Sequence, residues 1–202
     1  MQRFIALPLL ALTLAAAAPL QADPITDQID AARRAYEAGD ARVAIQALQF
    51  AVSQIEQQLT QQQLQLLPEP LPGWTADTAA AESSGLTAMI AGTQLTRSYQ
   101  KTDTDQTVKI TVTADSPLLS MMSMMMSAPI LMQANPNSSP YTFGGFRGIL
   151  EQDANAGTAK ITLMVGTRIL VQIDGAGGVD RQTLEAYLQA MNLQNLEKAL
   201  LG

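Results

Sequence analysis

Three prolines within five residues divide the chain into two parts that cannot share a continuous element. They are Pro68, Pro70 and Pro72. Each lacks the backbone donor that a helix interior or a sheet ladder requires, and each biases the preceding residue toward extended geometry. The residues before them are rich in Ala and Gln, whereas those after them alternate β-branched runs with Gly, Asn and Asp turns. We therefore expect a helical part over 23–67, a Pro-rich linker over 68–73 and a sheet-containing domain over 74–202.

The first part is predicted to be a pair of helices. Asp23 can cap the first helix with Pro24 at its first position, and Gly39 suits a left-handed cap at its end. Asp40 can cap the second helix, which is expected to reach Leu67. Apolar residues recur at helical spacing in both segments. In the first they are Ile25, Ile29, Ala32 and Tyr36, and in the second they are Ala44, Ile45, Leu48, Val52, Ile55 and Leu59.

The turn between these helices resembles part of a tetratricopeptide repeat (TPR). The matching residues are Tyr36, Gly39, Asp40, Ala44, Ile45, Leu48 and Ala51. The small Ala44 and Ala51 allow two helices to pack closely. Because a solenoid needs about three repeats to bury a continuous core and the chain holds one, the resemblance implies a single TPR-like helical hairpin. Such a hairpin could dock on a partner or on the rest of its own chain.

The second part is predicted to be an antiparallel sheet flanked by helices. Strands are expected around 94–99, 108–113, 160–165 and 168–173, with further short strands on either side of Gly144-Gly145. Helices are expected over 116–132, from Val179-Asp180 onward, and over 193–201 at the C-terminus. Strands, helix, strands, helix is an order typical of an α+β fold.

The second part also resembles a known fold group. The Leu71-Pro72-Gly73-Trp74 entry and the Gly-Gly before a strand are similar to the Mog1/PsbP/DcrB-like α/β group. The chain is further similar to a set of exported bacterial proteins with the same TPR-like hairpin and a Met-rich helix after Ala114-Asp115-Ser116-Pro117. The resemblance implies a binding or accessory role and brings no functional residues to this chain.

The first 22 residues predict an export signal. Arg3 supplies a positive start, an apolar stretch covers Phe4 to Ala18, and Ala22 suits signal-peptidase cleavage. The apolar stretch is shorter than the roughly 20 residues of a spanning helix. We therefore expect residues 1–22 to be a signal peptide and the mature protein to be a secreted, periplasmic one without an integral membrane segment.

The chain contains no Cys and no His. This composition excludes disulfides, thiol nucleophiles, His-based general bases and most zinc and iron sites. Asp103 and Asp105 lack the later Gly and Glu of a calcium loop. Since no nucleophile–base pair is visible, we expect a protein that is not an enzyme, with no catalytic residues, no cofactor and no metal site.

The net charge of −6 bears on partners. Nucleic acids and anionic lipids require basic patches, and the sequence has no Lys/Arg cluster. We therefore expect no nucleic-acid partner, and consider another periplasmic or envelope protein instead.

The predicted helix 116–132 is the most unusual feature. It contains Met121, Met122, Met124, Met125 and Met126, and its apolar arc spans roughly 220°, wider than packing on one sheet requires. Three interpretations follow. The methionines fill a core, or form an adaptable surface for a partner or apolar ligand, or bind Cu(I) through thioethers. These five residues are the candidate partner or ligand surface.

Two functions follow from these observations. The first is a non-catalytic periplasmic interaction or accessory module. The second is a carrier of an apolar ligand or Cu(I) through the Met-rich helix.

Overall fold

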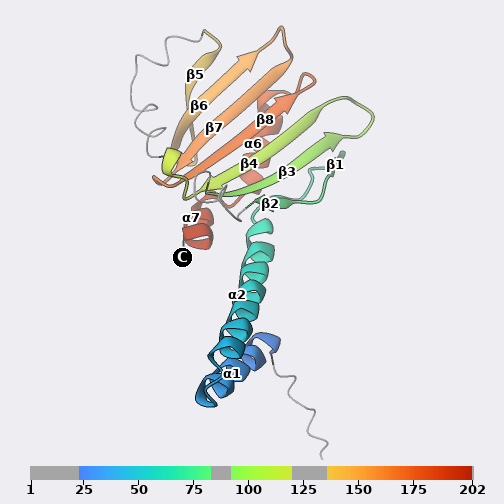
Figure 1. Cartoon of the computed structure of the whole chain (residues 1–202). Coiled ribbons are helices and arrows are strands. Elements are labelled where there is room, and N and C mark those ends of the chain that lie inside the picture. The colour runs from blue at the N-terminus through green and yellow to red at the C-terminus, as the bar shows by residue number, and fades with distance from the viewer. Residues whose placement is uncertain (1–22, 83–91, 120–135, 202) are drawn as a thin grey trace, which may run out of the picture. The chain divides into compact units, whose positions relative to one another are not determined.

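The structure of this protein is a computed structural model that describes residues 23–82, 92–119 and 136–201. It confirms the predicted α+β class, with two N-terminal helices, an eight-stranded antiparallel sheet and two C-terminal helices (Figure 1). The chain divides into two compact units between Ile55 and Glu56.

The first unit contains α1 (Pro24–Glu37) and the start of α2 (Ala41–Leu64). The Asp23 side chain accepts a hydrogen bond of 3.3 Å from the Ile25 backbone N–H, and Pro24 occupies the first turn. Gly39 has a φ of +85°, a conformation that glycine adopts without steric cost. The predicted caps of the first helix are therefore confirmed.

The helix α2 ends three residues earlier than expected. It stops at Leu64, and the backbone N–H groups of Leu66 and Leu67 donate to the carbonyls of Gln63 and Leu64 at 3.0 and 3.2 Å, in tight turns. Leu67 precedes Pro68, whose ring disfavours helical geometry in the preceding residue. The proline thus explains why the helix unwinds before the linker.

The second unit is built on one antiparallel sheet with the order β1-β3-β4-β8-β7-β6-β5, and β2 pairs separately with β3. The strands are β1 (Trp74–Ala76), β2 (Ala80–Glu82), β3 (Thr93–Lys101), β4 (Thr107–Ala114), β5 (Ser138–Phe143), β6 (Phe146–Asp153), β7 (Thr158–Val165) and β8 (Ile169–Ala176). Strands β5 to β8 form a meander, and β8 returns beside β4. The predicted pairing across Gly166-Thr167 is confirmed as β7–β8.

One face of the sheet forms the core. Because side chains alternate along each strand, the register places aliphatic residues of neighbouring strands in rows on this face. One such row runs through Leu95, Val112, Val171, Leu163, Gly148 and Tyr141. All of its side-chain-bearing members are buried.

Two helices pack against this core face, and one of them, α6 (Arg181–Ala190), lies behind the sheet in the view of Figure 1. The helix α6 packs on β7 and β8, and α7 (Leu193–Leu201) packs on β7. The Asp180 side chain caps α6 by accepting a hydrogen bond of 2.8 Å from the Thr183 backbone N–H. The predicted apolar face of α6, Leu184, Tyr187, Leu188 and Met191, is buried.

Gly148 is required by close approach between strands. A Cβ atom at this position would lie 2.0 Å from the backbone carbonyl oxygen of Thr162 on β7. No L side chain fits there without movement of the backbone. The glycine therefore allows β6 and β7 to approach closely.

Strands β1 and β2 were not expected from the sequence. Four of their six residues are Ala or Glu, which have weak strand preference, and only Trp74 and Thr75 favour a strand. They form because β3 offers a free edge, to which Thr75 and Ala81 pair opposite Gln100 and Leu95. Tertiary pairing here overrides local propensity.

The described part of the Met-rich segment is its start. Ser116 Oγ accepts a hydrogen bond of 3.3 Å from the Leu118 backbone N–H, and residues 117–119 are helical. From residue 120 onward the predicted helix lies outside the described residues, as does the predicted signal peptide over 1–22. Within the described ranges, no helix has the length and apolarity to cross a membrane.

Candidate interaction surface

Exposed large apolar side chains are concentrated on α1 and α2. Of the ten found among the described residues, nine belong to these two helices and one, Leu118, belongs to the sheet unit. The nine are Ile29, Tyr36, Val43, Ile45, Leu48, Phe50, Val52, Ile55 and Leu59. Single exposed apolar residues are normal, whereas a concentration of them is a feature of many interaction surfaces.

Five of these residues form one stripe along α2. At 100° per residue, they fall within an arc of about 80°. We call this stripe the α2 seam, and it consists of Ile45, Leu48, Val52, Ile55 and Leu59. Each of its side chains is 47% to 55% exposed, a fraction that leaves an aliphatic ridge open along the helix.

The α2 seam has the spacing of a coiled coil. Its members follow one another by three, four, three and four residues, which is the alternation of a and d positions in a heptad repeat. Helices with this spacing pack side chains of one helix into gaps between side chains of another. The seam therefore has the spacing that is found where two helices pack together.

The buried side of α2 in the first unit lies next to the seam. Ala44 and Ala51 are 4% and 2% exposed, and both fall on the same side of the seam, at g positions of the heptad. On α1, Ile25 and Ala32 are buried as well. The chain turns back at Gly39, so that α1 runs beside the start of α2 (Figure 1), while the side chains of the seam stay exposed.

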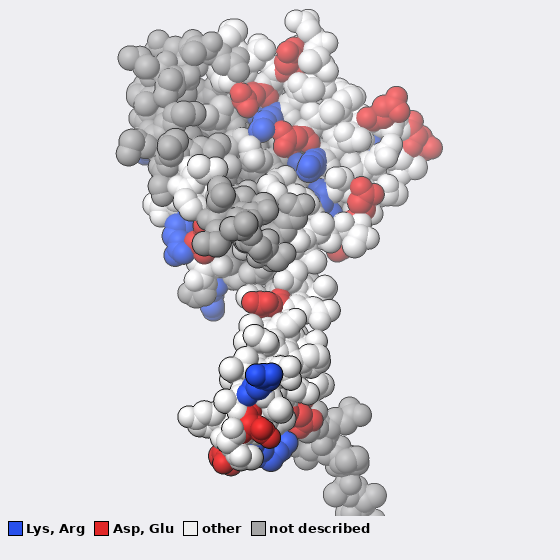
Figure 2. Space-filling view, viewed as in Figure 1, with Lys and Arg blue, Asp and Glu red and all other residues white. Residues whose placement is uncertain are grey.

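The polar residues of α2 are almost all neutral. Nine Gln lie between Gln46 and Gln65, and the only charged residues of the helix are Arg42 and Glu56. Both charged side chains are exposed, and neither makes an ion pair with any described residue. Figure 2 accordingly shows a largely uncoloured surface over α2.

The sequence identified the apolar face of α2 but not the whole exposed surface. Val43 and Phe50, each 51% exposed, lie seven residues apart on another face of α2 and were not singled out. Their spacing by two helical turns was a signal available in the sequence. Which faces remain uncovered depends on tertiary packing, which the spacing does not reveal.

A polar cluster joins the Pro-rich segment to β3. Arg97 donates to the carbonyl oxygens of Pro68 and Asp77 and makes two hydrogen bonds, of 3.1 and 3.3 Å, to the carboxylate of Glu69. These hydrogen bonds from Arg97, followed by its positive charge, lower the pKa of Glu69. Every polar group in this cluster has a structural partner, so we assign it to folding rather than chemistry.

A second polar cluster sits beside α6. Glu185 accepts hydrogen bonds from Tyr141 Oη at 2.9 Å and from Arg181 Nε at 2.6 Å. The Arg181 guanidinium lies 5.1 Å from the centre of the Tyr141 ring. Hydrogen bonding to Arg181 is the largest cause that lowers the pKa of Glu185, whereas burial raises the pKa of Tyr141 to about 12. A carboxylate held ionised by Arg and a tyrosine held neutral do not form an acid–base pair poised near neutral pH.

The face of the sheet opposite the core carries a row of alternating charges. The register aligns Lys109, Asp174, Lys160 and Glu151 on neighbouring strands. Lys160 Nζ lies 3.2 Å from Asp174 Oδ1, and Ser138 Oγ donates to Glu151 Oε1 at 3.2 Å. The alternation is visible in Figure 2. The row lines an open depression of about 500 Å³, in which opposite charges compensate one another.

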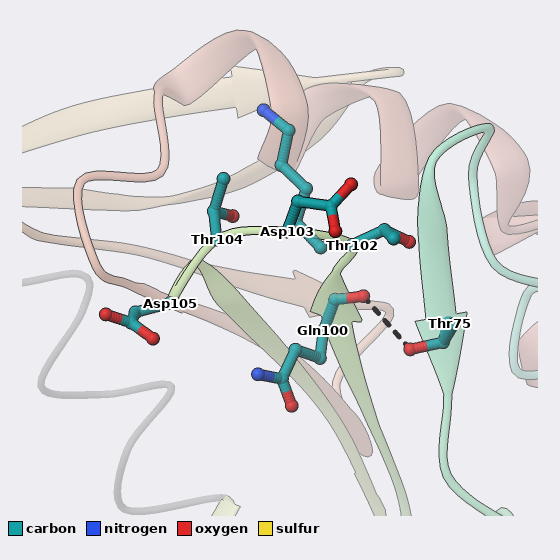
Figure 3. A pocket seen from close by; sticks show the side chains of 7 residues that line it. Thr75, Gln100, Thr102, Asp103, Thr104 and Asp105 are labelled. Carbon is teal, nitrogen blue, oxygen red and sulfur yellow. Dashed lines mark hydrogen bonds between the residues drawn. The ribbon is translucent and has the colours of Figure 1, made fainter.

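Another open depression, also about 500 Å³, lies at the turn between β3 and β4. The hydroxyl of Thr75 donates to the Gln100 carbonyl oxygen at 3.2 Å on one wall (Figure 3). The carboxylates of Asp103 and Asp105 point in different directions (Figure 3), and Asp103 takes a positive φ of 64° in the turn. Across the described ranges no group of three or more acidic side chains is placed to hold a metal ion.

The candidate surface predicted from the sequence cannot be located here. Met121, Met122, Met124, Met125 and Met126 all lie outside the described residues. The site with visible geometry is therefore the exposed surface of α1 and α2, with the α2 seam as its central feature. No protein-family model, curated protein or solved structure matches this chain, so its function is argued from its own residues.

Proposed function

We propose that this protein is a non-catalytic interaction module that binds another polypeptide through the α2 seam. The observation that carries the proposal is the concentration of nine exposed large apolar side chains on two helices. Apolar surface in water is unfavourable at about 25 cal/mol per Å², so burying the seam against a partner is a favourable step. The heptad spacing makes a helix the matching shape for that partner.

The chemistry of α2 favours a protein partner over a membrane. Helices that lie on membranes combine an apolar face with a polar face rich in Lys and Arg. The polar surface of α2 is Gln-rich, with Arg42 as its single cation. A polar border that is neutral apart from Arg42 and Glu56 suits a protein–protein interface, because few charges must be desolvated when the seam is covered.

The proposal also includes export to the periplasm and a similarity of fold to two known groups. The pattern of residues 1–22 supports export by a cleaved signal peptide into the periplasm, where the partner is an envelope or periplasmic protein. The hairpin with a single TPR-like turn, followed by a domain of the Mog1/PsbP/DcrB-like group, remains part of the same proposal. The lack of Cys and His supports a role without catalysis.

The alternative function is a carrier of an apolar ligand or Cu(I) through the Met-rich segment. It is supported by the clustering of Met121, Met122, Met124, Met125 and Met126 in the sequence. Thioethers select Cu(I), and flexible Met side chains adapt to varied apolar shapes. Native mass spectrometry of the purified protein tests it, since a bound copper ion or lipid would add a defined mass.

The interaction module is tested by photo-cross-linking. A photoreactive amino acid replaces Leu48 in the middle of the seam, and the protein is irradiated in the cells that produce it. The matched control replaces Gln57, which is exposed on the opposite side of the same helix. We expect a cross-linked polypeptide from position 48 that is absent or much weaker from position 57.

The outcomes distinguish a polypeptide partner from non-specific or lipid contact. A polypeptide adduct specific to position 48 supports the interaction module, and mass spectrometry identifies the adduct. Equal labelling at both positions, or adducts with lipid alone at position 48, contradicts it.

A further inference from the structure

We propose that the polypeptide bound by the α2 seam is a second copy of this chain, with the two α2 helices packed antiparallel. This inference rests on the proposed function, because it names the partner of the same surface. It is carried by two features of α2: the order of its apolar residues and the positions of its two charges.

The seam is self-complementary when α2 meets its own copy running in the opposite direction. In antiparallel coiled coils an a position faces a d position of the other helix. Aligning the two helices about their shared two-fold axis pairs Leu48 with Val52 of the second copy and Ile45 with its Ile55. Ala41 then faces Leu59 at each end. Every layer is apolar over about 27 Å of helix, so the seam covers itself completely.

The same alignment brings the two charges of α2 together. Arg42 and Glu56 both occupy e positions, on the side of the seam away from Ala44 and Ala51. In the antiparallel alignment e positions face e positions, and Arg42 of each copy lies opposite Glu56 of the other. Gln49 faces its own counterpart between them. Two ion pairs therefore form symmetrically from charges that have no ion-pair partner among the described residues.

The parallel alignment lacks this complementarity. In parallel pairs an e position faces a g position of the other helix. Glu56 would then face Ala51, and Gln49 would face Ala44, so neither charge would meet an opposite charge. Moreover Ala44 and Ala51 are already buried. The charge pattern thus favours antiparallel pairing.

The absence of cysteine makes the geometry directly testable. Two single-cysteine variants of the whole protein are made, Leu48→Cys and Val52→Cys, one of them carrying a tag that changes its size. Disulfide formation requires Cα atoms within about 7 Å of each other. Under mild oxidation we expect the mixture to form the 48–52 heterodimer at least about fivefold faster than either variant forms its homodimer, because only the mixed pair shares a layer.

Each outcome decides the inference. Preferential mixed dimers support antiparallel self-pairing. Fast homodimers of Leu48→Cys and of Val52→Cys, without preference for mixing, indicate parallel helices and overturn it. Disulfides no faster than those of the control Gln57→Cys overturn self-pairing altogether. In that case, a cross-link from position 48 to a different polypeptide would still support the interaction module. The lack of any polypeptide adduct at position 48 would contradict both the interaction module and self-pairing.

Charge exchange gives an independent test that introduces no cysteine. Arg42→Glu places like charges together at two symmetric sites. We therefore expect the dissociation constant of the dimer to rise about three- to tenfold, as measured by sedimentation over a range of concentrations. The double variant Arg42→Glu/Glu56→Arg should restore the original dissociation constant. Failure of the double variant to recover, after a loss in the single variant, contradicts the proposed facing of residues 42 and 56.

Discussion

The hydroxyl of Tyr99 donates a hydrogen bond of 2.7 Å to the backbone carbonyl oxygen of Pro68. Tyr99 is fully buried on β3, and the same carbonyl accepts a second hydrogen bond of 3.0 Å from Arg97. Pro68 has no backbone donor of its own, so side chains from the sheet hold this segment in place. These hydrogen bonds explain how the Pro-rich segment, which has no regular secondary structure, is anchored to the core.

Removing the Tyr99 hydroxyl should weaken this anchor. We expect Tyr99→Phe to lower the free energy of unfolding by about 1 kcal/mol, since the Pro68 carbonyl keeps its bond from Arg97. Urea unfolding followed by fluorescence measures the change, because Trp74 is the only tryptophan and its ring packs 5.8 Å from that of Tyr187. The exposed Tyr36 supplies the control, and Tyr36→Phe should leave the midpoint unchanged.

Acid should remove the contribution of the Arg97–Glu69 pair. Arg97 lowers the pKa of Glu69 from its ordinary value of 4.5, mainly through hydrogen bonds. A lowered folded-state pKa means that the contribution is present above the unfolded value and is lost as pH falls through the folded value. The wild type should therefore exceed Glu69→Gln in stability at neutral pH, and the gap should close in acid, as pH falls below the ordinary value of 4.5 and through the lowered folded-state pKa.

Urea midpoints of both proteins across this pH range measure the gap. A gap that stays constant into strong acid would show that the carboxylate charge is not what stabilises the pair.

Alkali should destabilise the sheet unit through its buried tyrosines. Burial raises the pKa values of Tyr141 and Tyr187 to about 12, well above the ordinary value of 10.0. Because the unfolded chain then loses protons first, stability is full below about pH 10 and declines as pH rises toward the folded-state values. The unfolding midpoint should fall over this window, and it should fall less steeply in Tyr141→Phe.

Tyrosinate absorbance of the folded protein provides the matching measurement. If the unfolding midpoints of Tyr141→Phe and the wild type fall equally steeply with rising pH, Tyr141 does not contribute to the alkaline transition.

Two glycines on the core face should differ sharply in their tolerance of a methyl group. At Gly148 a Cβ would lie 2.0 Å from the Thr162 carbonyl oxygen, so the backbone of β6 or β7 must move. At Gly175 the nearest atoms belong to the Leu184 and Val179 side chains, at 3.0 to 3.2 Å. We expect Gly148→Ala to cost about 3 kcal/mol or more and Gly175→Ala about 1 kcal/mol. Equal costs would contradict the close approach of β6 and β7.

A helix, strand or hairpin was predictable where the residues that determine it all lie within one short segment. The capped start of α1 needs only Asp23 and Pro24, and β4 needs only the alternation of Val108, Ile110 and Val112 with polar neighbours. The hairpin β7–β8 follows from two apolar runs joined at Gly166-Thr167. In each case the deciding residues are adjacent in sequence.

Features that depend on distant residues were not predictable. The pairing of β4 with β8 joins residues about 60 positions apart, and no local sequence pattern predicts this pairing. Strands β1 and β2 exist because β3 presents an edge, despite the weak strand preference of Ala80 and Ala81. The apolar face of α2 was visible in the sequence, but periodicity does not say whether such a face is covered.

The charged row on the face of the sheet opposite the core affects which alignment of β7 and β8 is favoured. The core sides of β7 and β8 present similar aliphatic residues at successive positions, so a slip of two residues would still bury them. The same slip would move Asp174 away from Lys160 and place it opposite Thr158 or Thr162. The short turn at Gly166-Thr167 sets the register of this hairpin, and the surface charges favour the same alignment over others that the core alone would tolerate.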